Sequence, residues 1–406
     1  MPVPVKNIYD VIIAGSGPAG ASAAYVLAKA GKKVLIVEKE KLPRYKTCGG
    51  GLTFKGLNLI PFDINEIIEK SCYVVNINDF EANVFILTKR EKPVISMTMR
   101  SNLDYHLIKA AEKFGAEVKD GVEIKDINIG KTNVEVIIKK NEEKFYSGFL
   151  IAADGALSVA AKKYFGISDR NLVPALEYEV HVADDILYRF GNIPRFDFGI
   201  VPGGYGWVFP KNDHLSIGVL SMNMKNGNMN NYFSAYLKSL QINKIERLEK
   251  HGFVIPLTYR KVFAGNRILL IGDAAGFIDP ITAEGISFAI LSGQIASEAL
   301  IKGNMDPATV YKEYNAQISK KIIPELKAGK ILAKFVYGYR YVRIWIVRLY
   351  GKKLSELMTD VIMGEKKYSE LVKDPLNYFK LLIKWSFYSK RKQKFFDNIN
   401  NMQTSS

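Results

Sequence analysis

The sequence predicts a mixed protein, α/β with α+β, in which a parallel-sheet domain is interrupted by an antiparallel sheet and followed by a mainly helical region. Three observations predict this class. A glycine-rich turn at residues 15–20 follows a short apolar run. A second glycine-rich turn, at residues 272–276, follows another apolar run. Between them, residues 173–263 alternate apolar and polar side chains, as half-buried strands do. With 406 residues the chain can form two or three domains with full cores.

The first unit reads as a strand at residues 9–14, a turn, a helix at 19–30 and a strand at 33–38. Its turn is Gly15-Ser16-Gly17-Pro18-Ala19-Gly20, where small residues let backbone N–H groups and the positive helix end approach a pyrophosphate. Glu38 follows Gly20 by 18 residues, close to where a carboxylate would reach a ribose hydroxyl. An ordinary βαβ unit with a surface glutamate is the alternative.

The second turn, Gly272-Asp273-Ala274-Ala275-Gly276, lies more than 250 residues later at the end of another apolar strand, 267–271. Two such turns indicate a large cofactor that is held at both ends. The parallel-sheet domain is therefore expected to be interrupted in sequence and continuous in space.

The segment that follows the first unit contains three consecutive glycines after Cys48, Gly49-Gly50-Gly51. They exclude a regular helix or strand interior and favour close approach of the backbone to another group. Arg100 then starts a helix to about Phe114. Strand signals follow at 117–119, 123–127, 134–139 and 148–152, before Asp154-Gly155.

The antiparallel sheet is predicted from four alternating runs, at 176–182, 198–201, 206–209 and 215–220. From Pro307 onward the chain is expected to be mainly helical.

The net charge of +16 is concentrated near the C-terminus. Residues 320–353 contain ten Lys or Arg and one acid, and residues 380–394 contain six bases and no acid. Aromatic residues interleave with these bases, a pattern typical of a peripheral contact with an anionic membrane. A solvated basic face is the alternative, and no nucleic-acid partner is expected because no recognition motif accompanies the charge.

Localisation and metal content are predicted from absences in the sequence. No secretory signal and no uncharged apolar run of about 18 residues is visible, so a cytoplasmic protein is expected, with peripheral contact at the inner membrane face. Only two cysteines occur, Cys48 and Cys72, which leaves at most one bridge open. No metal site is predicted, because His106, His181, His214 and His251 have no neighbour at ligand spacing.

Together, the turn at 15–20 with Glu38, the Asp154-Gly155 turn and Gly272-Asp273 resemble FAD-dependent proteins of the p-hydroxybenzoate-hydroxylase-type group. Two finer features are similar to the geranylgeranyl reductase family. They are Lys46-Thr47-Cys48-Gly49-Gly50-Gly51-Leu52 and the stretch from Gly203 to Lys211, which matches that family's Tyr-x-Trp-x-Phe-Pro signature. The resemblance is to the archaeal branch, which saturates the isoprenoid chains of digeranylgeranylglycerophospholipids.

The resemblance implies a Rossmann-like FAD-binding domain at 1–75, 100–172 and 264–306, an antiparallel-sheet substrate domain at 76–99 and 173–263, and a helical region at 307–406. It implies that Ala19 and Glu38 hold the pyrophosphate and adenosine ribose, and that Arg100 and Ile124 contact the adenine-nucleotide half. The flavin half would be contacted by Cys48, Gly49, Gly51, Asp273, Gly285 and Ile286. The implied cofactor-binding set is completed by Gly15, Gly17, Gly20, Asp154 and Gly155.

The implied reaction is reduction of C=C bonds in geranylgeranyl chains of membrane lipid precursors, with a hydride from N5 of reduced flavin and a proton. Cys48 is the candidate proton donor, the alternative being a small residue that fills space beside the cofactor. Tyr205, Trp207 and Phe209 alternate along one strand face and are candidates for the substrate channel, or else core aromatics. The substrate would be a geranylgeranyl lipid or a prenyl diphosphate.

Two other classes stay open at this point. One is a FAD-dependent monooxygenase or epoxidase on a lipophilic substrate, and the other is a flavoprotein that transfers electrons to quinone. The electron donor would be a ferredoxin or NAD(P)H that binds transiently, because no second GxGxxG turn appears.

Overall fold

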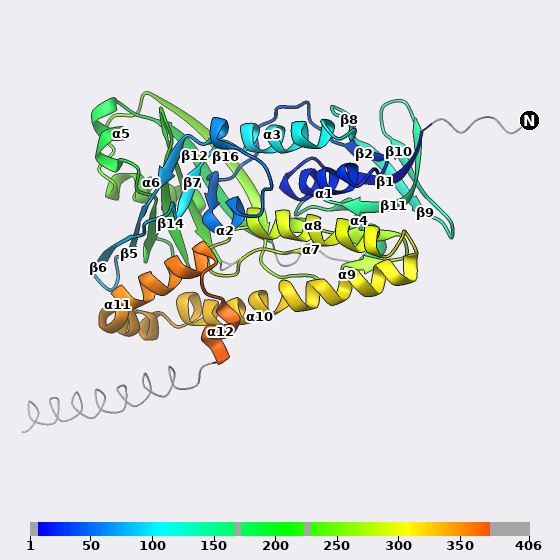
Figure 1. Cartoon of the computed structure of the whole chain (residues 1–406). Coiled ribbons are helices and arrows are strands. Elements are labelled where there is room, and N and C mark those ends of the chain that lie inside the picture. Colours follow the sequence, from blue (N-terminus) through cyan, green and yellow to red (C-terminus); the bar gives the residue numbers. More distant parts are fainter. Residues whose placement is uncertain (1–6, 167–171, 223–227, 374–406) are drawn as a thin grey trace, which may run out of the picture.

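The computed structural model describes residues 7–166, 172–222 and 228–373 (Figure 1). Its first layer is an eight-stranded sheet with the order β17-β18-β11-β1-β2-β8, to which β10 and β9 are added beside β11. Strands β18, β11, β1, β2 and β8 run parallel. The strands of this sheet are β1 (Ile8–Ala14), β2 (Val34–Val37), β8 (Glu117–Lys119), β9 (Ile124–Ile129), β10 (Val134–Ile138), β11 (Lys144–Ala152), β17 (Ala264–Gly265) and β18 (Ile268–Leu270).

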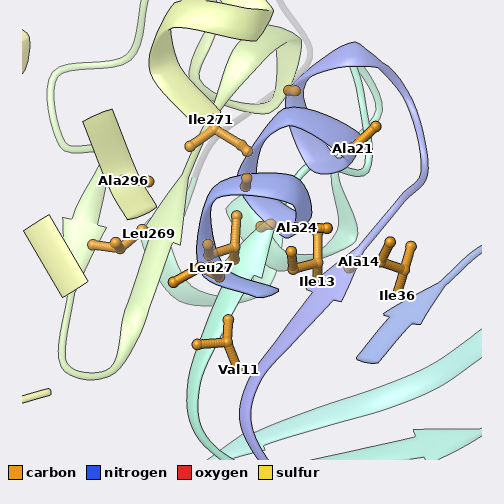
Figure 2. Close-up of a cluster of buried hydrophobic side chains, with 14 of the residues drawn as sticks. Val11, Ile13, Ala14, Ala21, Ala24, Leu27, Ile36, Leu269, Ile271 and Ala296 are labelled. Carbon is orange, nitrogen blue, oxygen red and sulfur yellow. The ribbon is translucent and has the colours of Figure 1, made fainter. Parts of the chain in front are cut away.

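Helices α1 (Pro18–Lys29), α3 (Arg100–Glu112) and α8 (Ile286–Lys302) pack side by side against this sheet (Figure 1). Helix α1 follows β1 directly, with Gly17 at its N-cap and Pro18 in its first turn, where the missing N–H costs nothing. Figure 2 shows the core that results, in which side chains of β1 and α1 meet those of β18 and α8. The strands read as continuous apolar runs because a parallel sheet is covered on both faces.

The second layer is a seven-stranded sheet with the order β16-β12-β15-β14-β13-β5-β6, antiparallel except for the β13–β5 pair. Its strands are β5 (Val74–Asp79), β6 (Val84–Lys89), β12 (Leu172–His181), β13 (Arg195–Phe198), β14 (Gly204–Pro210), β15 (Leu215–Ser221) and β16 (Arg247–Pro256). Helices α5 (Asp184–Phe190) and α6 (Met229–Ser239) belong to the same half of the molecule, and α6 packs on β12 and β15.

A third, small sheet is formed by strands that lie between β2 and β8 in the sequence, and the glycine-rich loop leads into its first strand. It has the order β3-β7-β4, with β3 (Gly51–Thr53), β4 (Lys70–Cys72) and β7 (Ile95–Met97). Short helical turns accompany it, α2 (Phe54–Leu57) and the 3₁₀ turn Asn65–Ile67. Both Cys48 and Cys72 are free thiols.

The C-terminal part of the described chain is helical and crosses beneath both layers (Figure 1). It contains α9 (Pro307–Lys321), α10 (Ile323–Ala333), a π turn at Lys334–Gly338, α11 (Arg340–Met363) and α12 (Tyr368–Lys373). Two further helices, α4 (Val159–Phe165) and α7 (Gly272–Ala275), follow β11 and β18. Within the described residues, no helix is both long and apolar enough to cross a bilayer.

The predicted fold class is confirmed, with differences of detail. The run expected as a strand at 198–201 is shifted, because β13 ends at Phe198. Segment 76–99 is divided, since it supplies β6 to the large antiparallel sheet and β7 to the small one. The domain boundaries themselves stay a prediction, and the basic segment at 380–394 lies outside the described residues.

Candidate active site

A cavity of about 940 Å³ is lined by residues from all three sheets. Every residue that the sequence singled out for the site lines it, except Gly20. The predicted residues on the lining are Gly15, Gly17, Ala19, Glu38, Cys48, Gly49, Gly51, Arg100, Ile124, Asp154, Gly155, Tyr205, Trp207, Phe209, Asp273, Gly285 and Ile286. The structure therefore brings together segments that lie up to about 270 residues apart.

The two glycine turns contact each other at one end of the cavity. A Cβ on Gly272 would lie 3.0 Å from the Cβ of Ala19, and one on Gly15, whose φ is +102°, would lie 2.4 Å from the carbonyl oxygen of Ala153. Gly20 is just behind the lining, where a Cβ would lie 2.1 Å from the carbonyl oxygen of Gly15. Gly20 therefore lets the helix pack against its own turn, which keeps the turn close to any ligand.

Glu38 is buried and is held by the first turn. Its Oε2 accepts hydrogen bonds from the backbone N–H and the hydroxyl of Ser16, at 3.0 and 2.6 Å, and lies 3.4 Å from Nε of Arg44. Burial alone would raise the pKa of Glu38, but Arg44, Ser16 and the N–H of Glu40 outweigh it and hold the pKa below its ordinary value. The carboxylate is thus ionised and fixed at the cavity edge.

Two buried guanidinium groups face the same turn. Arg44 and Arg100 share the carboxylate of Asp104, which is 1% exposed, with contacts of 3.1 Å from Arg44 and 2.8 Å from Arg100. A Cβ on Gly17 would lie 3.8 Å from Arg44 and 3.9 Å from Arg100. The N-terminus of α1 and two fixed positive charges therefore converge on one place, which suits a polyanion.

Lys46 and Asp273 form the next part of the lining. The Lys46 ammonium is buried, has no hydrogen-bond partner among the described atoms and lies over the ring of Phe253. Burial and the nearby Arg100 lower the pKa of Lys46 to about 7. Burial raises the pKa of Asp273, against the opposing effect of Lys46 and Arg100. The unpartnered Lys46 ammonium is placed to bind a polar atom of a ligand, and the Asp273 carboxyl lines the cavity with it.

The glycine-rich loop packs against aromatic side chains. Its three glycines predicted a close approach of the backbone to another group, and the ring of Phe209 is one such group. A Cβ on Gly49 would lie 2.7 Å from Phe209, and one on Gly51 would lie 2.9 Å from the same ring. Cys48 is half-buried, and its thiol interacts with the guanidinium of Arg100. The missing Cβ atoms therefore let the Cys48 loop lie flat on β14.

The predicted aromatic face of β14 forms the opposite wall. The ring centroids of Tyr205 and Trp207 are 6.1 Å apart, and Phe196 of β13 lies 5.3 Å from Phe209. The Tyr205 hydroxyl donates to the carbonyl of Thr282, and Gly218 leaves room for the Trp207 indole. The apolar part of the lining is completed by Ala175, Leu220, Phe253, Ile255 and Ile362.

Sequence inspection missed a polar group where the two walls meet. Oε1 of Glu177 on β12 lies within hydrogen-bond distance of the Tyr45 hydroxyl, at 3.0 Å, and accepts the Cys48 N–H at 3.2 Å. Tyr45 and Glu177 both line the cavity. Nothing local in the sequence marks this pair, except that Glu177 lies with Glu179 in a strand whose other residues are mostly apolar.

Three potential metal ligands, His181, Asp213 and His214, also come together, with one ligand atom of each within 4.8 Å of the others. Each ring nitrogen of His214 already faces a carboxylate, Asp213 at 2.7 Å and Glu179 at 3.1 Å. The cation Arg247 lies 2.9 Å from Nε2 of His181. We therefore describe this group as a hydrogen-bonded cluster and propose no metal there.

The lining fits FAD. The α1 N-terminus with Arg44 and Arg100 suits a diphosphate, and Glu38 lies one strand away, as a ribose contact requires. The unpartnered Lys46 ammonium and the unpartnered Oδ1 of Asp154 supply polar atoms along the same wall. The other oxygen of Asp154 accepts the N–H of Val159 at 2.9 Å and so also caps α4.

Comparison with known proteins gives the same cofactor. Residues 8–184 match the FAD binding domain family. The chain is 36% identical to an uncharacterized protein of Methanosarcina barkeri. The alignment spans 339 residues and covers 81% of this chain and 84% of the relative. It is 30% identical to a geranylgeranyl diphosphate reductase of Rhodobacter capsulatus, over 72% of this chain and 74% of the relative.

Two further proteins are similar to this chain, one by sequence and one by both sequence and structure. A digeranylgeranylglycerophospholipid reductase of Methanothermobacter thermautotrophicus is 28% identical, over 86% of this chain and 94% of the relative. A solved geranylgeranyl bacteriochlorophyll reductase-like protein of Thermoplasma acidophilum is 25% identical, with a TM-score of 0.75 over 91% of this chain and 99% of the other.

Fold, lining and family match define the class: this is a FAD-dependent oxidoreductase. Within that class, the chain belongs to the geranylgeranyl reductase family. The resemblance that the sequence motifs indicated is confirmed, as is the cofactor. The roles of individual site residues stay predictions.

Proposed function

We propose that the protein reduces C=C bonds in geranylgeranyl chains, and that its substrate is a lipid-bound chain of a membrane lipid precursor. The observation that carries the proposal is the division of one cavity into two walls. One wall is polar and fits FAD, and the other presents the aromatic residues of β14 and their apolar neighbours. An isoprenoid chain has no polar handle, so an extended apolar wall beside the cofactor is what it requires.

The chain's own residues would divide the work between them. Arg44, Arg100 and the α1 N-terminus would hold the diphosphate of FAD, and Tyr205, Trp207 and Phe209 would orient the prenyl chain and exclude water. Bound FAD, once reduced, would supply the hydride. Cys48 would supply the proton to the neighbouring carbon, since it lies on the lining between the two walls.

The relatives' names support a geranylgeranyl substrate, and they include both free diphosphate and lipid-bound forms. We favour the lipid because the digeranylgeranylglycerophospholipid reductase matches over 94% of its length, against 74% for the geranylgeranyl diphosphate reductase of Rhodobacter capsulatus. The electrons would come from a ferredoxin or from NAD(P)H that binds transiently.

The test is an anaerobic incubation of FAD-loaded protein with dithionite and either a geranylgeranylated phospholipid or geranylgeranyl diphosphate. Mass spectrometry of the prenyl tail should show gains in steps of two hydrogens. Faster saturation of the lipid supports the finer proposal, and exclusive use of the diphosphate contradicts it. Unchanged tails, or oxygen addition when air and NAD(P)H are supplied, would overturn the reductase activity.

We also propose that the C-terminal helices contact an anionic membrane surface. Phe335, Tyr339 and Tyr341 are 40%, 54% and 80% exposed, and Lys334 and Arg348 are exposed beside them. Two members of the expected pattern turn inward instead. Tyr337 donates to the carbonyl of Ile281, and Arg343 is paired with Asp79 at 2.9 Å and with Glu81.

Vesicle flotation tests this contact. The protein should float with phosphatidylglycerol-containing vesicles and not with phosphatidylcholine vesicles, and Tyr341→Ser with Tyr339→Ser should weaken flotation. Binding that is indifferent to lipid charge and to both substitutions would contradict the proposed contact.

A further inference from the structure

The hydroxyl of Tyr45 lies between two carboxylates. It is 3.0 Å from Oε1 of Glu177 and 3.0 Å from Oε1 of Glu179, which point to the same face of β12 because they are two residues apart. A phenol carries a single proton and can donate to only one of the two oxygens. Both contacts are hydrogen bonds only if one carboxyl is itself protonated and donates to Tyr45. This geometry gives the three side chains a place to hold one extra proton.

The surroundings assign that proton to Glu177. Oε2 of Glu179 lies 3.1 Å from Nε2 of His214, so Glu179 has a cationic partner, and its pKa lies below the ordinary value although burial opposes this. Burial and the neighbouring charge of Glu179 raise the pKa of Glu177 to about 7. Burial also opposes the charged form of His214, but Glu179 and Asp213 raise the pKa of that ring.

Two other titratable groups face the pair. Lys211 is fully buried and donates to the carbonyls of Gly49 and Thr98, at 2.9 Å each. The ring of His251, on the neighbouring strand β16, stacks on Tyr45 with 3.9 Å between centroids. Lys211 favours the ionised form of Glu177, but burial and Glu179 are the larger effects.

These contacts form a chain of neighbouring polar groups from solvent to the cavity, in which the His214–Glu179 link is a 3.1 Å ion-pair contact that is not aligned as a hydrogen bond and Tyr45 is itself 38% exposed. The Asp213 side chain is 74% exposed, and its Oδ1 lies 2.7 Å from Nδ1 of His214. His214 contacts Glu179, Glu179 contacts Tyr45, and Tyr45 contacts Glu177, which lines the cavity and accepts the N–H of Cys48.

We propose that His214, Glu179, Tyr45 and Glu177 form a proton relay that delivers the proton consumed in each reduction from the surface at Asp213 to the cavity beside Cys48. This rests on the proposed function, because a flavoprotein that only transferred electrons would not consume a proton at a substrate carbon. Each double bond takes one hydride and one proton. Glu177 and Cys48 act at the cavity, and Tyr45, Glu179 and His214 act through them as positioning residues.

The proton balance closes without any redox change in the relay. Cys48 gives its thiol proton to the carbon. Glu177, which contacts the backbone N–H of Cys48, returns a proton to the thiolate after its carboxyl group turns toward the sulfur. Tyr45 passes its phenolic proton to Glu177 and takes one from the Glu179 carboxyl. Glu179 receives that proton from His214 at Oε2 and presents it to Tyr45 after a half-turn of the carboxyl group. His214 is recharged from water at Asp213.

The chain offers a matched control on the same strand. Tyr178 lies between the two glutamates, points to the other face of the sheet, stacks on Phe233, and its hydroxyl lies 3.3 Å from Asn230. Tyr178→Phe therefore removes a buried phenol from β12 without touching the relay.

The first measurement is the infrared carboxylic-acid C=O band of the FAD-loaded protein, followed through neutral pH. The wild type and Tyr178→Phe should show a band that is lost with a midpoint near pH 7, and Glu177→Gln should lack it. A band that survives in Glu177→Gln would overturn the assignment of the stored proton.

The second measurement is the rate at which a geranylgeranyl lipid oxidises the dithionite-reduced flavin in a single turnover. In the wild type and Tyr178→Phe the rate should fall as pH rises through about 7, because Glu177 loses its proton. Tyr45→Phe should slow this step by roughly 100-fold, with unchanged FAD content and unchanged reduction by dithionite.

A Tyr45→Phe rate and pH profile equal to those of Tyr178→Phe would overturn the relay and leave the proposed function standing. Failure of the wild-type flavin to be oxidised by the prenyl substrate would overturn the proposed function, whatever the infrared band shows.

Discussion

The two walls of the cavity are built by opposite means. The cofactor wall, the polar wall that fits FAD, combines backbone that can approach a ligand closely, in the glycine turns and the N-terminus of α1, with buried charges such as Arg44 and Arg100 that are fixed by Asp104. The β14 wall is built from large side chains, and Gly218 on the neighbouring strand β15 makes room for the Trp207 ring. The difference shows that glycine has two uses in one site. It lets the backbone approach a ligand, and it makes room for a large neighbouring side chain.

Among changes confined to the cofactor wall, Asp104→Ala is expected to have the largest effect on stability. This change leaves Arg44 and Arg100 buried without their shared carboxylate, which should cost about 3–5 kcal/mol of unfolding free energy. Chemical denaturation of the FAD-loaded protein measures it. Lys41→Ala is the control, because the Lys41–Asp120 pair is exposed and its loss should cost no more than about 1 kcal/mol. Equal costs for the two variants would contradict the buried network.

A pair of glycine substitutions separates the two uses of glycine. Gly20→Ala forces a Cβ to within 2.1 Å of Gly15 and should cost about 1–3 kcal/mol and lower the FAD content of the purified protein. Gly218→Ala places a Cβ 1.9 Å from Trp207 and should cost a similar amount. It should, however, impair oxidation of the reduced flavin by prenyl substrate and leave FAD bound. Loss of FAD in both variants would contradict the separation of the walls.

A smaller effect is expected from Lys46. Its pKa is about 7 in the cofactor-free protein, and a diphosphate nearby would favour the charged ammonium. Above pH 7, FAD binding must therefore take up a proton, and affinity should fall as pH rises by at most about tenfold per unit. Fluorescence titration of FAD into stripped protein measures this slope. Lys46→Met should abolish it and Lys302→Met, at an exposed lysine away from the cavity, should not; identical slopes in all three proteins would refute the assignment.

The parts of the site that could be predicted from sequence are those whose signals are local. The turn at 15–20 and the alternation of Tyr205, Trp207 and Phe209 each depend on a few consecutive residues, and both lie on the lining. The position of β13 was shifted because Phe198 ends that strand and the apolar residues after it form a turn.

The relay residues and the Arg44–Asp104 contact could not be predicted in the same way. Tyr45 meets Glu177 across 132 residues, and Arg44 meets Asp104 across 60. Only the fold decides which polar residues of separate segments meet, and two glutamates within a mostly apolar strand were the single available hint. Sequence inspection likewise treated His214 as isolated, although Glu179 and Asp213 both face it.

The order of strands in the parallel sheet has a consequence for how the chain folds. β11 lies between β1 and β18, yet β18 is synthesised only after most of the antiparallel sheet. During translation the part of the β11 edge that pairs with β18, Leu150 to Ala152, stays uncovered, because β10 pairs only with residues 144–147. Closing the sheet requires contacts between residues far apart in sequence, which slows folding. A nascent chain that ends before residue 264 should expose an unpaired strand edge that can pair with another chain. We therefore expect that only a nearly complete polypeptide binds FAD.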